Sequence, residues 1–127
     1  MPPEGNPWIV FVVDDEEMIS STLGLILRGR GYDARSFVDP VEALKASQSA
    51  SPDLLLTDVM MPQMNGIDLA IQVTQLNPTS RVLLFSGQAA TQDLLPRANS
   101  EGYHFNLLSK PVPPKTLIDK IRELFHD

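Results

Sequence analysis

Five polar side chains follow apolar segments at places where they could do chemistry together. Two aspartates end "IVFVVDD", one ends "DLLLTD", a serine ends "RVLLFS", and a lysine follows "YHFNLLS". Clustered carboxylates resist joint ionisation unless a cation lies between them, and Mg²⁺ prefers carboxylates, waters and phosphate oxygens. An aspartate can act as a nucleophile, while a lysine and a hydroxyl can stabilise a moving phosphoryl group. The set therefore fits phosphoryl transfer to a carboxylate, and it comprises Asp14, Asp15, Asp58, Ser86 and Lys110.

Apolar runs alternate with helical patterns along the chain, and these elements must position the five side chains. Continuous or alternating apolar runs predict strands, and apolar residues that recur at helical spacing predict helices. The predicted strands cover 8–13, 33–37, 53–58, 81–86 and 103–109. The predicted helices begin near residues 16, 39, 66, 89 and 113.

Turn-forming residues mark several helix ends. Gly31 stops the first helix, Asp39 has the character of an N-cap, and Asn77-Pro78 ends the third helix. Pro96 falls inside the segment 89–102 and predicts a short or kinked helix there. The apolar faces predicted for the first, third and last helices comprise Ile19, Leu23, Ile26 and Leu27; Leu69, Val73 and Leu76; and Leu117, Ile118, Ile121, Leu124 and Phe125.

Five strand–helix pairs predict an α/β fold. Right-handed crossovers between parallel strands place helices on both faces of one sheet, which gives a three-layer αβα sandwich. In such sheets the working site lies beyond the carboxyl ends of the strands. The residues that directly follow each strand are therefore the ones expected to meet in one crevice.

The bulk composition narrows the classes of function. The 127 residues fit one domain, expected over 8–127 after a disordered lead-in over 1–7. The net charge of −6 argues against direct nucleic-acid binding, and no apolar run approaches the length of a membrane span. The lack of cysteine excludes disulfides and is compatible with a cytoplasmic location.

Four segments together resemble the receiver domain of bacterial two-component response regulators, including the chemotaxis regulators. These are "VVDDEE", "LLLTDVMMPQMNG", "LLFSG" and "LLSKPVPP", in this order and spacing. The most specific is D-x-x-M-P-x-M-x-G, which runs from Asp58 to Gly66. The similarity covers residues 8–126 and implies a flavodoxin-like (βα)5 fold with strand order 2-1-3-4-5.

The resemblance also implies a role for each site residue. Asp58 matches the phosphoacceptor, and Lys110 matches the lysine that pairs with the phosphoryl group. Its bond to Pro111 is usually cis in the family. Ser86 matches the switch hydroxyl, while Pro62 and Gly66 shape the loop after the third strand.

A divalent cation, Mg²⁺ or Mn²⁺, is implied as the cofactor. Asp15 matches a direct ligand, Asp14 matches a residue that acts on the metal largely through water, and Asp58 contributes its own carboxylate. The backbone carbonyl of Met60 completes the protein's share of the coordination. Met60, Met61 and Met64 are expected to be loop and packing residues, because thioethers bind hard cations poorly.

The resemblance implies a signalling role with little enzymatic activity beyond self-phosphorylation and slow autodephosphorylation. The phosphoryl donor would be a histidine kinase or a phosphotransfer protein. The output partner is not specified; it could be an effector domain of a longer protein, and a homodimer is also compatible. No membrane partner is expected, and the sequence does not separate a stand-alone receiver from part of a larger regulator.

Two departures from the family pattern concern the output face. The family has an aromatic residue three positions before the lysine, where this chain has Leu107; Tyr103 or Phe105 could take over that role. Pro96 disturbs the same face, so we expect a non-standard partner surface.

Met60 and Gln88 occupy positions that influence dephosphorylation in the family.

Other interpretations of the same residues remain open at this point. A phosphohydrolase of the haloacid dehalogenase kind would have its nucleophile on the first strand, but Glu16 stands where its general acid belongs. A flavodoxin-like cofactor binder would need a first loop that does not repel phosphate. A degenerate receiver could act as an interaction module alone, although all the expected acids and the lysine are present.

Blander roles are also open for individual residues. Any of the site aspartates could be a turn or capping residue, and Lys110 a surface lysine. Glu16 and Glu17 are expected at the start of the first helix, facing solvent. Trp8 is expected to be a packing residue, and His104 and His126 are expected to be exposed.

Overall fold

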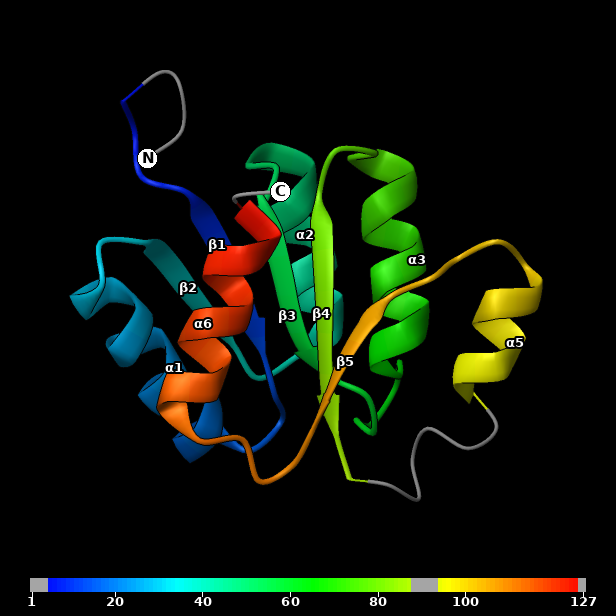
Figure 1. Ribbon diagram of the computed structural model, residues 1–127. Coiled ribbons are helices and arrows are strands. Elements are labelled where there is room, and N and C mark those ends of the chain that lie inside the picture. Colours follow the sequence, from blue (N-terminus) through cyan, green and yellow to red (C-terminus); the bar gives the residue numbers. More distant parts are fainter. Residues whose placement is uncertain (1–4, 88–93, 126–127) are drawn as a thin grey trace.

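The computed structural model describes residues 5–87 and 94–125, which form five strands and five helices around one parallel sheet (Figure 1). The strand order is β2-β1-β3-β4-β5, as the resemblance implied, and the three-layer αβα sandwich is confirmed. The elements are β1 Ile9–Val13, α1 Glu17–Gly29, β2 Asp33–Phe37, α2 Pro40–Ser49, β3 Leu54–Asp58, α3 Gly66–Leu76, β4 Arg81–Ser86, α5 Leu94–Ser100, β5 Asn106–Ser109 and α6 Pro114–Phe125.

The three central strands are almost completely buried. Every residue of β3 is buried, as are all but the first residue of β1 and of β4. Helices cover both faces of these strands, which is why their sequences read as continuous apolar runs rather than as alternating ones. This burial fixes the register of the sheet and hence the positions of the residues that follow each strand.

Alternating side chains of each strand enter two separate cores. Phe11 and Val13 face α2, α3 and α5, whereas Val10 and Val12 face α1 and α6. In Figure 1, α1 and α6 lie in front of the sheet, while α2 and α3 lie behind it. Trp8 extends the front core, because its ring stacks on that of Phe125 at 4.4 Å, so its predicted packing role is confirmed.

Local signals in the sequence account for the helix ends. Asp39 accepts a hydrogen bond from the Val41 N–H and caps α2, as predicted. Asn65 caps α3 in the same way, through the Asp68 N–H. Gly31 adopts a φ of 93° directly after α1, a conformation that glycine reaches without steric cost.

The last strand was predicted too long. It begins at Asn106, because Gly102 turns the chain with a φ of 94° and the Tyr103 N–H bonds back to Ala98 of α5. Tyr103 and Phe105 therefore precede β5, and their side chains pack against the α3 face of the sheet.

Two helix predictions also need adjustment. Leu76, assigned to the apolar face of α3, is 50% exposed because it is the last residue of that helix. The helix predicted over 89–102 is described only as α5, with Pro96 as its third residue; 88–93 lie outside the described residues.

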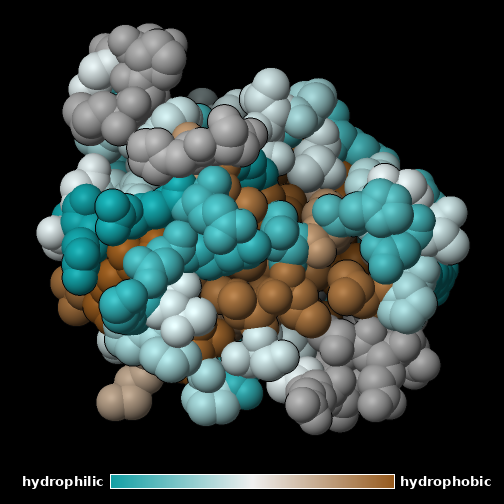
Figure 2. Space-filling view, viewed as in Figure 1, coloured by the Kyte–Doolittle hydropathy of each residue, from teal (hydrophilic) through white to brown (hydrophobic). Residues whose placement is uncertain are grey.

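The surface over β5 is partly apolar. Figure 2 shows apolar side chains gathered between α6 and α5, where Phe105, Leu107 and Leu108 are only partly buried. A groove of about 800 Å³ opens at the start of β4 and β5, lined in part by Arg81, His104 and Leu124.

Among the helices formed by 5–87 and 94–125, none is both long and apolar enough to cross a membrane.

The close approach of α1 to β2 yields a prediction about stability. A side chain at Gly24 would overlap the Ser36 hydroxyl, which donates to the Ser20 carbonyl at 2.7 Å, whereas a side chain at Gly29 would meet open space. We expect Gly24→Ala to lower the free energy of unfolding by about 1 kcal/mol through overpacking. The control Gly29→Ala should be neutral or stabilising, because alanine favours the helix.

Urea unfolding of both variants checks this expectation. In a Ser36→Ala background the cost of Gly24→Ala should shrink, because the overlapping oxygen is gone. An unchanged cost in that background would show that the Ser36 hydroxyl is not the obstacle.

Candidate functional site

The sheet register places Asp14 and Asp58 side by side. Strands β1 and β3 are parallel neighbours with Val13 opposite Thr57, so the next residue of each strand reaches the same edge. Both aspartates are buried, Asp14 completely. Asp15 is exposed, and carboxylate oxygens of all three aspartates lie within 4.8 Å of one another. The predicted cluster of acids is therefore present at the carboxyl end of the sheet.

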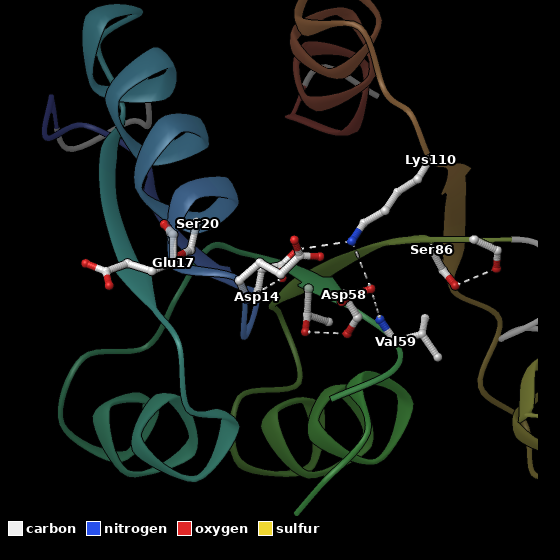
Figure 3. Close-up of polar contacts among 10 residues, drawn as sticks. Asp14, Glu17, Ser20, Asp58, Val59, Ser86 and Lys110 are labelled. Carbon is white, nitrogen blue, oxygen red and sulfur yellow. Dashed lines mark hydrogen bonds and ion pairs between the residues drawn. The ribbon is translucent and has the colours of Figure 1, made fainter. Parts of the chain in front are cut away.

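Lys110 reaches this cluster from the end of the edge strand β5. It follows β5, and its Nζ lies 3.2 Å from Asp14 Oδ2 and 3.4 Å from Asp58 Oδ1 (Figure 3). Nζ also lies 5.1 Å from the centre of the Phe85 ring, and the Lys110 N–H donates to the Ser86 carbonyl. The Lys110–Pro111 bond is cis, as the resemblance implied.

Two backbone N–H groups hold the carboxylates in place. The Glu16 N–H donates to Asp14 Oδ1 and the Val59 N–H donates to Asp58 Oδ1, both at 2.9 Å. Sequence reasoning missed these contacts, because a backbone donor carries no residue-type signal. The one indirect signal is proximity in the chain, since each donor lies within two residues of the aspartate that it contacts.

Burial and mutual repulsion set the ionisation of the site. Burial raises the pKa of Asp14, against the Glu16 N–H and Lys110, which lower it. Burial also raises the pKa of Asp58, and the neighbouring Asp14 charge raises it further. Burial lowers the pKa of Lys110, but Asp58 and Asp14 together outweigh this, and the net shift is upward. The lysine is thus held as a cation, while the two carboxylates resist joint ionisation.

Gly66 is required by the approach of α3 to the acidic pocket. A Cβ at this position would overlap the backbone carbonyl of Asp58, and the Gly66 N–H donates to the Val59 carbonyl at 2.7 Å. The start of α3 therefore packs directly on the chain that carries Asp58. This contact gives a physical reason for the glycine that ends the D-x-x-M-P-x-M-x-G pattern.

The structure does not bring the Ser86 hydroxyl to the acids. Ser86 is buried at the end of β4, but its Oγ donates to the Gly87 carbonyl at 2.8 Å, and Figure 3 shows it turned away from Asp58. The Met60 side chain is 59% exposed, which fits a loop residue. The switch role of Ser86 and the ligand role of the Met60 carbonyl stay predictions.

The remaining assignments can be placed individually. Glu16 and Glu17 are exposed at the start of α1, and His104 is exposed, all as predicted. Met61 and Met64 pack against the core between the sheet and helices α2, α3 and α5, called here the α3 core. Gln88 and His126 lie outside the described residues.

The donor set suits a hard divalent cation. Three carboxylates converge, and a single described ammonium, that of Lys110, contacts two of them and offsets one negative charge. Oxygen-only ligands with excess negative charge are what Mg²⁺ and Mn²⁺ bind, and a cation between the acids would favour the ionised forms that burial and mutual repulsion disfavour. The residues present therefore fit the implied cofactor.

Comparison with known proteins identifies the class. The family model of the response regulator receiver domain matches residues 10–122, and the chain belongs to this family. A solved receiver domain protein (CheY-like) from Methanospirillum hungatei JF-1 has a TM-score of 0.85 at 25% identity, with 94% of each chain covered.

Two curated relatives illustrate the range of proteins that contain such a domain. The chain is 31% identical over 122 residues to chemotaxis protein CheY of Treponema pallidum, covering 94% of this chain and 83% of CheY. It is 32% identical over 113 residues to the DNA-binding response regulator MtrA of Mycobacterium tuberculosis, covering 89% of this chain and 48% of MtrA. The chain thus spans about half the length of MtrA.

The charge balance at the site yields a prediction about stability without metal. Lys110→Met leaves two buried carboxylates without their cation, and we expect a loss of about 1–3 kcal/mol in the free energy of unfolding. Asp58→Asn removes one of the repelling charges and leaves Asp14 paired with Lys110, so we expect little loss or a gain. Urea unfolding in EDTA measures both.

Lys115→Met is the matched control, because Lys115 is exposed and pairs with exposed Asp119 at 2.8 Å. Its effect should stay within about 0.5 kcal/mol. If Asp58→Asn destabilises the protein as much as Lys110→Met, mutual repulsion of the acids is not the dominant interaction at the site.

Proposed function

We propose that Asp58 accepts a phosphoryl group and that this domain is the phosphorylated switch of a two-component system. The observation that carries the proposal is the joint position of Asp58, Lys110 and the acids at the carboxyl end of the sheet. A buried carboxylate lies 3.4 Å from a lysine ammonium, next to two further carboxylates that suit a divalent cation. This is the arrangement that phosphoryl transfer to an aspartate requires.

The contacts of Asp58 suggest which oxygen reacts. Oδ1 accepts a hydrogen bond from the Val59 N–H and lies near Lys110, whereas Oδ2 accepts none from the described residues. In the proposed step, Oδ2 forms a bond to phosphorus while the bond between phosphorus and a donor imidazole nitrogen breaks, and the imidazole takes up a proton. Lys110 then shifts its contact toward a phosphoryl oxygen and stabilises the added negative charge.

The proposed metal ligands are Asp15, Asp58 and the Met60 carbonyl, with Asp14 acting largely through water. When bound, Mg²⁺ or Mn²⁺ would neutralise charge on the phosphoryl oxygens. Asp14 has a second role, because its Oδ2 holds the Lys110 ammonium in place before transfer.

Coupling to the output face is proposed to start at Ser86. Its hydroxyl donates to the Gly87 carbonyl, and rotation toward a phosphorylated Asp58 would exchange that bond for one to a phosphoryl oxygen. Leu107 occupies the position of the family's switch aromatic and is partly buried against the α3 core. We propose that the movement is relayed by packing in that core rather than by an aromatic rotamer.

The proposed phosphoryl donor is a histidine kinase or a phosphotransfer protein, and the proposed location is the cytoplasm. The output partner is an effector domain in a longer chain or a separate protein, with a homodimer as a further form. We further propose that residues 8–127 form one receiver domain and that this domain does not turn over a separate substrate.

Phosphorylation by acetyl phosphate in Mg²⁺ tests the proposal directly. Intact mass should show one added phosphoryl group on the wild-type chain and none on Asp58→Asn, because the acceptor oxygen is replaced by an amide. Omission of Mg²⁺ should abolish the adduct.

Asp68→Asn is the matched control, since Asp68 is an exposed aspartate in the first turn of α3. It should be labelled as well as the wild type. Equal labelling of Asp58→Asn would disprove the assignment of the acceptor, and no adduct in any condition would favour a receiver that acts only as an interaction module.

A further inference from the structure

A second pocket lies at the end of the sheet opposite the acids. Its volume is about 300 Å³, and it opens between the start of β1, the end of α1 and the last turns of α6. This size falls at the lower end of small-molecule sites. Its walls combine apolar rings with guanidinium groups, and they include Trp8, Arg30, Tyr32, Ile118, Arg122 and Phe125.

The aromatic wall is a continuous row of rings. Phe125 lies between Trp8, stacked at 4.4 Å with an angle of 5°, and Tyr32, tilted at 5.9 Å. Arg81 lies over the same rings, with its guanidinium carbon 5.8 Å from Trp8 and 5.3 Å from Phe125. Phe125 is itself buried, but Trp8 and Tyr32 are only partly buried and line the pocket, so their rings offer apolar contact to a flat heterocycle.

The charges around the pocket are unusual for an acidic chain. The net charge is −6, yet across 5–87 and 94–125 no carboxylate forms an ion pair with Arg30, Arg81 or Arg122. By contrast, Arg35 and Arg97 each pair with a nearby carboxylate. Three guanidinium groups without a described carboxylate partner therefore gather around one aromatic cluster.

The nearby acids and helix ends account for this grouping only in part. Asp33 is paired with Arg35. Asp119 is paired with Lys115, and attraction to Arg122 and Arg30 also helps to lower its pKa, but it forms no ion pair with either arginine. Arg122 lies in the last turn of α6, where a cation offsets the helix dipole, but Arg30 lies beyond the end of α1 and Arg81 begins a strand. Arg30 and Arg122 line the pocket beside the rings, and neither forms an ion pair with a carboxylate of the described residues, so an anionic ligand would find both available.

We propose that this pocket binds a nucleotide, with the heterocycle against the aromatic row and the phosphate on Arg30 and Arg122. Guanidinium groups bind phosphate through paired N–H donors, and the rings supply the apolar contact that a simple anion would not use. The pocket is separate from the acidic site, so the proposal does not depend on phosphorylation of Asp58.

Titration of the full chain with AMP or GMP in EDTA tests the proposal. EDTA removes divalent cations that could bridge a phosphate to the acidic site. Calorimetry gives the dissociation constant, and the emission of Trp8, the only tryptophan, reports occupancy of the pocket itself. We expect saturable binding with a change in Trp8 emission, and at least about tenfold weaker binding of the matching nucleoside or of inorganic phosphate alone.

Arg30→Gln/Arg122→Gln should weaken nucleotide binding at least about tenfold, and both positions are exposed, so the fold should be retained. Arg97→Gln is the control, because Arg97 is exposed and lies away from this pocket. The affinity of this variant for the nucleotide should match that of the wild type. No saturable binding at millimolar nucleotide would overturn the proposal. Equal binding of inorganic phosphate, or an equal loss in Arg97→Gln, would overturn it in favour of charge attraction alone.

Discussion

The burial of neighbouring carboxylates is the constraint on which the acidic site depends. Asp14 and Asp58 lie next to each other at the ends of neighbouring strands, and Asp15 adds a third charge. Burial is the largest cause of the raised pKa values of Asp14 and Asp58, and neighbouring carboxylate charge adds to it; Lys110 and two backbone N–H groups offset these effects only in part. Uncompensated negative charge of this kind suits a divalent cation, and in the proposed function such a cation would allow an anionic phosphoryl group to approach.

The fold places these charges together at a cost that its core must offset. Three separate segments carry these charges: the ends of β1, β3 and β5. The buried central strands fix each end, and Gly66 lets α3 pack directly on the backbone of Asp58. Asp58, the proposed phosphoacceptor, is therefore held by rigid elements rather than by a long loop, which would favour a defined geometry for the proposed transfer.

Much of the architecture could be predicted from the sequence because the strong signals are local. Continuous apolar runs identified the central strands, and Asp39 and Gly31 marked helix ends that the structure confirms. The start of β5 could not be found in this way, because Tyr103 and Phe105 look like strand residues until the turn at Gly102 directs them into the core. The acids and Lys110 follow from strand ends, whereas the backbone donors to them and the orientation of Ser86 depend on dihedral angles that residue types do not encode.

The dependence of the site on a cation is the central claim, and Mg²⁺-dependent stability tests it most directly. At a Mg²⁺ concentration about 100-fold above the dissociation constant, the free energy of unfolding of the wild type should rise by about 2.7 kcal/mol. Asp15→Asn should lose most of this gain, since Asp15 is an exposed member of the acidic cluster and its replacement should leave the fold intact. Glu16→Gln, which alters the adjacent exposed carboxylate outside the cluster, should keep the gain. An equal Mg²⁺ effect on all three proteins, or none on the wild type, would contradict a metal site formed by these acids.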